Sequence, residues 1–192
     1  MPSPVGHSLI GLAVGLAWLL PRGPRAGLGE LLRACGPYVP WLLLAANLPD
    51  LDYLPGLLVG ELNRYHHLYT HTLGWVLVTS ALMAAGWRRF QPVSYGRCFL
   101  LLVMLQASHL LADMFTADGR APFGIMALWP LHAGYLQADI ALFPMPRKAT
   151  VGEMFQWYNV GVMAREALVA LPLLLAVAGW KITATQKVEP GI

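Results

Sequence analysis

Histidine and aspartate residues gather in three short clusters within an otherwise apolar chain. The clusters are Asn47-Leu-Pro-Asp50-Leu-Asp52, His66-His67-Leu-Tyr-Thr-His71 and His109-Leu-Leu-Ala-Asp113, and His7 lies near the start. An aspartate at the centre of a membrane helix costs about 2.5–3.5 kcal/mol, so such residues are usually kept for pairing or for function. Imidazole and carboxylate groups are also common ligands of metal ions. The clusters therefore predict a shared metal site in a membrane protein.

The spacing within two of the clusters suits metal binding. His109 and Asp113 are four residues apart, so on a helix they share one face. For an isolated pair, a hydrogen bond within the helix is the ordinary interpretation. Asp50 and Asp52 follow Pro49, which ends a helix, and a solvated turn is their ordinary interpretation. We expect one of these two aspartates, Asp50 first, to bind metal and the other to orient a ligand or bind a second metal.

Three histidines within six residues make the densest cluster. His67 and His71 are four residues apart, whereas His66 and His71 need a bend between them to meet. Three imidazoles so close together seldom serve packing alone, and an interfacial role is the alternative. A lone His7 is typical of a helix cap, so its assignment depends on the fold. The predicted metal ligands are His7, Asp50, Asp52, His66, His71, His109 and Asp113.

The composition is that of a membrane protein. Of 192 residues, 57% are hydrophobic and 12% are charged, and the mean hydropathy is +0.54. Soluble domains are about 45–50% apolar and about 25% charged. The net charge of +3 comes from small basic groups between apolar segments, which membrane topology explains better than nucleic-acid binding does. No linker or repeat divides the sequence, so residues 1–192 are expected to form a single domain.

Five apolar segments predict an all-α bundle of about five transmembrane helices. They cover residues 4–20, 32–48, 71–87, 95–115 and 156–180. The last two are long enough to span the hydrocarbon layer, whereas the first three have about 17 residues, near the lower limit. Pro37 and Pro40 interrupt the second segment. A soluble helical bundle is the alternative.

The basic residues predict the orientation in the membrane. With five spans, eight of them fall on one side, which the positive-inside rule makes cytoplasmic. The N-terminus is then outside, the C-terminus is inside, and all the His and Asp clusters reach the outer face. Cys35 and Cys98 fall on the cytoplasmic side, where thiols stay reduced, so no structural disulfide is expected. The eight basic residues are Arg22, Arg25, Arg33, Arg88, Arg89, Arg97, Lys181 and Lys187.

Four motifs then occur in a recognisable order within residues 4–143: GHSLIG, NLPDLD, HHLYTHT, and SHLLADMFTADG followed by FGIMALWPL. They resemble those of the bacterial inner-membrane-associated metal-dependent hydrolase family. That family is similar to zinc-dependent phospholipase C and zinc-dependent single-strand nucleases, which are helical enzymes that act on phosphoesters. The resemblance assigns a His-x-x-x-Asp element to His109 and Asp113, an Asp element to Asp50, and the following His to His66 or His71.

The resemblance also implies the cofactor. Two Zn²⁺ ions are expected, although another divalent metal would suit the same ligands. A third zinc site in the related enzymes pairs a late His with an acid, but His132 has Leu136 at that spacing, and Asp118 and Asp139 are only distant substitutes. The chain also has His67-Leu68 where the family usually has Arg-Gly, which removes one arginine that can bind phosphate.

The function that the resemblance implies is hydrolysis of a phosphoester by metal-activated water. A membrane lipid or lipid-linked phosphate at the periplasmic face of the bacterial inner membrane is the expected substrate. Asp52 or Asp118 is expected to accept the proton of the water. The candidate ligands for the substrate phosphate are Arg64, Arg120, Arg147 and Lys148, which would otherwise serve as interfacial anchors.

Two other classes of function compete with hydrolysis. A transporter or sensor would place polar residues along a whole path across the bilayer, whereas the inner halves of the predicted helices are apolar. A non-catalytic protein would use a closed metal site to hold its helices together or to bind a partner. The number of candidate ligands exceeds what one closed tetrahedral site needs, which favours catalysis.

Overall fold

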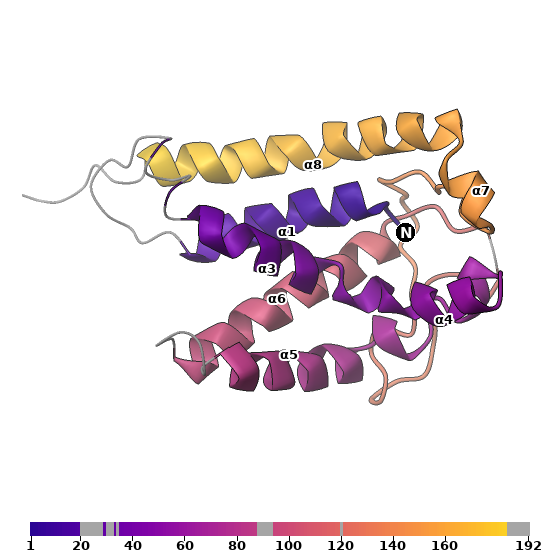
Figure 1. The fold of residues 1–192 in the computed structure, drawn as a ribbon, viewed down its shortest axis with the longest axis horizontal. Coiled ribbons are helices and arrows are strands. Elements are labelled where there is room, and N and C mark those ends of the chain that lie inside the picture. The colour runs from indigo at the N-terminus through magenta and orange to yellow at the C-terminus, as the bar shows by residue number, and fades with distance from the viewer. Residues whose placement is uncertain (20–28, 30–32, 34, 88–93, 120, 184–192) are drawn as a thin grey trace, which may run out of the picture.

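Helices form the regular structure of this protein, and a long loop region covers one end of the helix bundle (Figure 1). The computed structural model describes residues 1–192 apart from 20–28, 30–32, 34, 88–93, 120 and 184–192. The longer helices are α1 (Pro4–Leu19), α3 (Val39–Ala46), α5 (Leu73–Trp87), α6 (Tyr95–Met114) and α8 (Trp157–Thr183). The shorter elements are η1 (Gly36–Tyr38), η2 (Leu48–Asp52), α4 (Tyr53–Leu58), η3 (Leu62–Arg64), η4 (Tyr69–His71) and α7 (Val151–Met154).

Helix α6 lies at the centre of the bundle, where α1, α3 and α5 pack around it. Its buried residues recur every three or four positions, so one stripe of the helix faces its neighbours. That stripe is apolar near its start, at Cys98, Leu102 and Leu105, and it carries His109 and Asp113 near its end. Helix α8 packs against α1 on the outside (Figure 1). One face of α6 therefore supplies both core contacts and polar side chains.

Each predicted helical segment contains a helix, so the all-α class is confirmed. The second segment differs most, because a single helix was expected over residues 32–48 and α3 covers only Val39–Ala46 after the short turn η1. Pro37 and Pro40 explain this difference. Proline lacks the N–H that a helix interior needs, and both prolines occupy the first positions of their elements.

Two helices, α6 and α8, are long and apolar enough to cross a membrane. The 20 residues of α6 rise about 30 Å, which matches the thickness of the hydrocarbon layer. Helix α8 exposes Leu168, Leu173 and Leu175, a surface suited to lipid rather than to water. Helices α1, α3 and α5 have 16, 8 and 15 residues, so the five-span arrangement stays a prediction.

The loop between α6 and α7 folds back on itself over one end of the bundle (Figure 1). Ile125 N donates to Leu136 O at 3.1 Å, and Leu73 N at the start of α5 donates to Ala127 O at 2.8 Å. Gly124 permits the turn, because its φ is 85° and a Cβ there would lie 2.3 Å from Leu136 O. The loop is therefore hydrogen-bonded to itself and to the helices, which fixes the backbone around the polar end of α6.

Buried polar side chains link the helices near that end. Between α5 and α6, Thr79 Oγ1 donates to Gln106 Oε1 at 2.8 Å, and Gln106 Nε2 donates to Ser80 Oγ at 2.9 Å. Just before α1, Ser3 N donates to Glu166 Oε1 of α8 at 2.7 Å. Hydrogen bonds between buried groups satisfy atoms that would otherwise be costly to bury. They fix the helices that carry His7 and His109 relative to α5 and α8.

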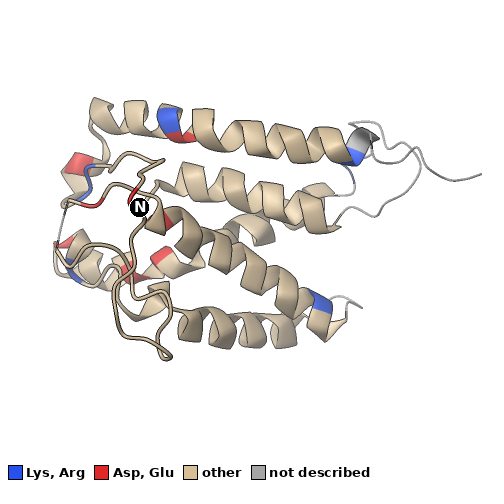
Figure 2. Ribbon diagram, turned by 180° about the vertical axis from the view of Figure 1, so that it is seen from behind, with Lys and Arg blue, Asp and Glu red and all other residues tan. Residues whose placement is uncertain are grey.

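Charge divides the molecule into two ends. Among the described residues, Asp and Glu lie at the loop-covered end or on the adjoining part of α8, where Lys and Arg also occur, whereas the opposite end carries Lys and Arg without Asp or Glu (Figure 2). The helices between the two ends are nearly free of charge (Figure 2). This is the distribution expected of a bundle whose middle lies in hydrocarbon.

We predict that Gly11→Ala destabilises the bundle, because a Cβ at Gly11 would lie 2.4 Å from Ala46 Cβ on α3. Overpacking of this kind typically costs about 1–3 kcal/mol, so thermal unfolding in detergent should occur at a lower temperature. The matched control is Gly161→Ala on α8, where an added Cβ has nothing within 4 Å. Equal unfolding temperatures for the two variants would contradict the close contact between α1 and α3.

Candidate metal centre

Four separate segments bring imidazole and carboxylate groups together at the loop-covered end of the bundle. His7 lies in the first turn of α1, Asp50 lies in η2, and His71 ends η4. His109 and Asp113 lie one turn apart on the buried face of α6. The three histidines are at most 1% exposed. The tertiary fold, rather than local spacing, thus assembles this cluster of side chains.

Four atoms from these residues form a compact group, which we call the four-atom cluster: His71 Nε2, His109 Nε2, Asp50 Oδ1 and Asp113 Oδ2. Each Nε2 lies 3.6 Å from Asp50 Oδ1 and 3.3 Å from Asp113 Oδ2. The two Nε2 atoms are 3.3 Å apart. Ligands about 2.0–2.1 Å from a tetrahedral ion lie about 3.3–3.4 Å from one another. The five distances among these atoms are therefore close to those between neighbouring ligands of one metal ion.

The hydrogen bonds on the far side of each ring determine which nitrogen carries the proton. His109 Nδ1 lies 2.8 Å from Ala46 O, and a carbonyl oxygen can only accept, so Nδ1 is the donor. His71 Nδ1 lies 3.0 Å from Thr70 Oγ1 and 3.2 Å from Asp52 Oδ2. The Thr70 hydroxyl donates to Asp52 Oδ2, so both neighbours offer acceptor lone pairs to Nδ1. In the neutral rings both Nε2 atoms then carry lone pairs. Two lone pairs and two carboxylate oxygens face one another, an arrangement that a cation would stabilise.

His7 extends the cluster toward a second position. Its ring stacks on that of His109 with 3.6 Å between centroids, and its Nε2 lies 3.4 Å from Asp113 Oδ1. The other oxygen of Asp113 belongs to the four-atom cluster. The carboxylate of Asp113 can therefore bridge two cations, with His7 as a ligand of the second.

Several of these atoms lack hydrogen-bond partners despite their burial. They are Asp50 Oδ1, both carboxylate oxygens of Asp113 and both ring nitrogens of His7. Native proteins rarely leave buried polar atoms without a partner, because desolvation is then uncompensated. All three residues point at the same small volume. Bound metal ions would satisfy the aspartate oxygens and His7 Nε2 together, so the donor set fits a metal site.

The electrostatics favour positive charge at this centre. Burial by itself would raise the pKa of Asp50, but the nearby rings of His109 and His71 hold that pKa well below its usual range. Burial acts to lower the pKa of His71, but hydrogen bonds to Asp50 and Asp52 outweigh it and raise the pKa. The carboxylates thus attract protons onto the rings when no other cation is present. A divalent metal would supply that charge instead.

Asp52 holds the ligand His71 in place instead of facing the four-atom cluster. Its Oδ2 accepts from Thr70 Oγ1 at 2.7 Å and from His67 N at 3.2 Å, in addition to the contact with His71 Nδ1. Its Oδ1 lies 2.8 Å from His66 Nδ1. Both oxygens are engaged, which disfavours the predicted roles of Asp52 as a metal ligand or proton acceptor. A carboxylate behind a ligating histidine orients the ring and raises its basicity.

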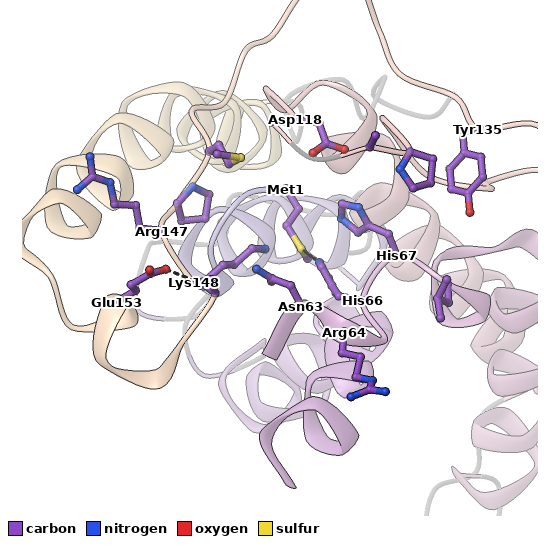
Figure 3. A pocket seen from close by; sticks show the side chains of 17 residues that line it. Met1, Asn63, Arg64, His66, His67, Asp118, Tyr135, Arg147, Lys148 and Glu153 are labelled. Atoms are coloured by element: carbon purple, nitrogen blue, oxygen red, sulfur yellow. Dashed lines mark hydrogen bonds between the residues drawn. The ribbon is translucent and has the colours of Figure 1, made fainter. Parts of the chain in front are cut away.

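His66 and His67 form the wall between the cluster and a pocket of about 330 Å³. The ring of His66 contacts Asp52 on one side and the Met1 sulfur on the other (Figure 3). His67 has a φ of 68°, in the left-handed region, and its Nε2 is buried without a hydrogen-bond partner. Ligand atoms of His66, His67 and His71 lie within 4.8 Å of one another. The pocket therefore reaches the immediate surroundings of the metal centre.

The pocket distinguishes among the four predicted phosphate ligands. Lys148 points inward toward Asn63 and Met1, whereas Arg64 and Arg147 point away (Figure 3). Arg64 lies 3.7 Å from Glu61, and the guanidinium of Arg147 lies 4.6 Å from the Tyr158 ring centre. Burial lowers the pKa of Lys148, and the nearby carboxylates only partly oppose this effect. Because Lys148 alone of these three points inward, it is the cation best placed to meet an anion in the pocket.

The structure brings five of the seven predicted metal ligands together at the centre. The other two are Asp52, which contacts the far side of the His71 ring, and His66, which contacts Asp52. Asp118 lines the pocket, where its Oδ2 accepts from Gly124 N at 2.9 Å. His132 and Asp139 are exposed and lie outside the metal-ligand groups of the described residues. Arg120 lies outside the described residues. Sequence patterns gave no signal for the carbonyl of Ala46, which orients His109.

We predict that the purified protein binds a divalent metal and that His109→Ala and Asp113→Ala abolish binding, because each change removes a ligand of the four-atom cluster. Elemental analysis after dialysis measures the metal content. His132→Ala is the matched control, since that histidine is exposed and belongs to none of the metal-ligand groups of the described residues, and it should retain the wild-type content. Equal loss of metal in all three variants would contradict the assignment. A wild-type protein that contains no metal would contradict it as well.

Replacing Asp52 tests its role behind His71. Asp52→Asn keeps the size of the side chain but weakens the acceptor for His71 Nδ1, so we predict a reduction of about 10- to 100-fold in metal affinity with unchanged stoichiometry. Competition with a chromophoric chelator measures the affinity. Asp139→Asn, at an exposed position, serves as the control. A fall in stoichiometry instead of affinity would make Asp52 a direct ligand.

Comparisons with known proteins agree with the membrane character of this fold. A family model described as YdjM inner membrane protein matches residues 1–188. The chain is 31% identical over 162 residues to the inner membrane protein YbcI of Escherichia coli (strain K12). This match covers 78% of this chain and 83% of that protein. No solved structure matches it. The bacterial inner-membrane location expected from the sequence is supported by both names, and the chain belongs to the YdjM inner membrane protein family.

Proposed function

We propose that this protein is a membrane-embedded metal-dependent hydrolase that cleaves a phosphoester of a membrane lipid or lipid-linked phosphate. The observation that carries the proposal is the convergence of His71 Nε2, His109 Nε2, Asp50 Oδ1 and Asp113 Oδ2 at 3.3–3.6 Å. Imidazole and carboxylate ligands at these distances suit Zn²⁺, and two ions would be held by Asp113 together with His7, His71, His109 and Asp50.

The second metal position separates an enzyme from a structural site. Four protein ligands around one tetrahedral ion would close its coordination, as in sites that only stabilise a fold. At the second position, His7 Nε2 and Asp113 Oδ1 are 3.4 Å apart, and ligand atoms of His7, Asp50 and His109 lie within 4.8 Å of one another. If Asp50 and His109 bind the first ion, the second ion keeps coordination positions open for water and substrate. The adjoining pocket and its inward-pointing lysine add to this support (Figure 3). A closed metal site in a non-catalytic membrane protein is the second candidate, and the four-atom cluster alone would fit it.

In the proposed reaction, different residues of the chain have different roles. A divalent ion, when bound, lowers the pKa of water and polarises a phosphoryl oxygen. Lys148 is placed to hold the negative charge of the phosphate within the pocket. Asp118 is the candidate to accept the proton of the attacking water, because it lines the same pocket as Lys148 and Asp52 does not. Asp52 and Ala46 O hold the His71 and His109 rings in position.

The position of the centre supports a substrate in the membrane. His109 and Asp113 lie in the last turns of α6, at one end of a helix about 30 Å long, where lipid headgroups would lie. Exposed apolar side chains surround this end, including Leu58, Leu131 and Phe155. The opposite end carries Arg33, Arg97 and Lys181, so the positive-inside rule would orient the metal centre toward the periplasm. In this proposal, five helices span the membrane.

Hydrolysis is tested with the purified protein on bis(p-nitrophenyl) phosphate and on vesicles of a mixed phospholipid extract. We predict turnover that requires added metal, is lost in Asp113→Ala, and falls by about 10²- to 10⁴-fold in Asp118→Asn. Lys148→Gln should raise KM more than it lowers kcat, because it weakens binding of the phosphate.

Arg64→Gln is the matched control for Lys148→Gln, since Arg64 also lines the pocket but its guanidinium points away from Lys148 (Figure 3). It should leave both kinetic constants close to those of the wild type. One tightly bound ion per chain without turnover on either substrate would favour the closed structural site.

A further inference from the structure

A second site lies at the end of the bundle opposite the metal centre. There the end of α1, the start of α3, the end of α5 and the start of α6 enclose a crevice of about 310 Å³. An adjoining hollow of about 540 Å³ shares part of its wall. We call the two together the aromatic crevice, after the residues Trp18, Tyr38, Trp41 and Trp87 that line it. Nothing in the proposed hydrolase chemistry uses it.

Apolar and aromatic walls make this crevice suitable for hydrocarbon. Trp41 and Trp87 pack edge to face with ring centres 4.8 Å apart, and Trp41 is nevertheless 49% exposed. On the neighbouring helix surfaces, Leu82 of α5 and Leu100 of α6 are also exposed. Tryptophan and tyrosine at the ends of membrane helices lie at the headgroup level, with their apolar rings toward the acyl chains. The crevice thus lies where a lipid chain would meet it.

The mouth of the crevice is positively charged. Ser94 and Arg97 line it at the start of α6, and the first turn of this helix contains no acidic residue. Ser94 is the N-cap but makes no side-chain capping hydrogen bond, so the N–H groups of the first turn keep their positive field. No described Asp or Glu lies at this end of the molecule (Figure 2). A basic residue beside a helix N-terminus suits a phosphate group.

We propose that the aromatic crevice binds one anionic phospholipid, with an acyl chain against Trp41 and Trp87 and the headgroup phosphate beside Arg97. The first turn of α6 is about 24 Å along the helix from Asp113, so this site is separate from the metal centre and belongs to the opposite membrane boundary. Basic pockets between membrane helices bind anionic headgroups by this combination of charge and apolar contact. The proposal is independent of hydrolysis.

Gly86 offers a way to fill the crevice without disturbing the fold. It lines the adjoining hollow, and a Cβ at this position would have nothing within 4 Å. Gly86→Leu therefore occupies space that the lipid would need, while leucine favours the helix more than glycine does. Gly161→Leu on α8 is the matched control, because Gly161 is equally open but lies away from the crevice. Arg97→Gln removes the charge alone.

Native mass spectrometry of the full chain, with dioleoylphosphatidylglycerol or dioleoylphosphatidylcholine added in detergent, tests the proposal. We expect one phosphatidylglycerol to be retained in preference to phosphatidylcholine. Arg97→Gln should reduce this retention about fivefold, the effect of one basic residue near an anionic lipid. Gly86→Leu should abolish retention of phosphatidylglycerol, and Gly161→Leu should leave it unchanged.

Three results would overturn the lipid site. Equal retention of the two lipids would show that the headgroup charge plays no part in binding. Retention of phosphatidylglycerol by the Gly86→Leu variant would show that the lipid binds outside the crevice. A dimer that Gly86→Leu dissociates would assign the crevice to a second copy of this chain. Unfolding temperatures measured on the same samples distinguish lost binding from lost structure.

Discussion

The need for positive charge among four buried nitrogen and oxygen atoms is the constraint on which the structure of the loop-covered end depends. His71, His109, Asp50 and Asp113 direct lone pairs and carboxylate oxygens at one another within 3.3–3.6 Å. Ala46 O and Asp52 keep the protons of both rings on the far side. A fold with these groups unpaired in a buried site would carry a large desolvation cost. A bound cation would remove that cost, and the segments that converge there would then stabilise one another.

This constraint explains why the bundle has an apolar part and a separate polar end along its length. The apolar stripe of α6 packs against α1, α3 and α5 by burial of hydrocarbon, which needs no precise geometry. The last turns of the same helix need precise positions, and the loop that ends at α7 and the hydrogen bonds of Gln106 and Glu166 provide them. Gly11 contributes by allowing α1 to approach Ala46, whose carbonyl orients His109. Packing and metal binding are therefore coupled through one backbone position.

Sequence reasoning predicted the features that depend on local pattern. The spacing of His109 and Asp113 indicates that they share one helical face, and the apolar runs indicate the all-α class. The proline positions place Asp50 and Asp52 just after a helix, where Asp50 is the preferred ligand. The roles of side chains brought together by the tertiary fold could not be read in this way. Whether His66 or His71 faces the centre depends on the turn at His67, and the choice of Lys148 over Arg64 depends on which side chain points into the pocket.

X-ray absorption at the zinc edge, recorded on the purified and zinc-loaded protein, tests the central claim most directly. The account predicts four nitrogen and oxygen ligands at about 2.0–2.1 Å, with the scattering pattern of two imidazoles per ion at the four-atom cluster. His71→Ala should remove one imidazole from that pattern. A spectrum with sulfur ligands, or one with no imidazole contribution, would contradict a metal centre built from His71 and His109.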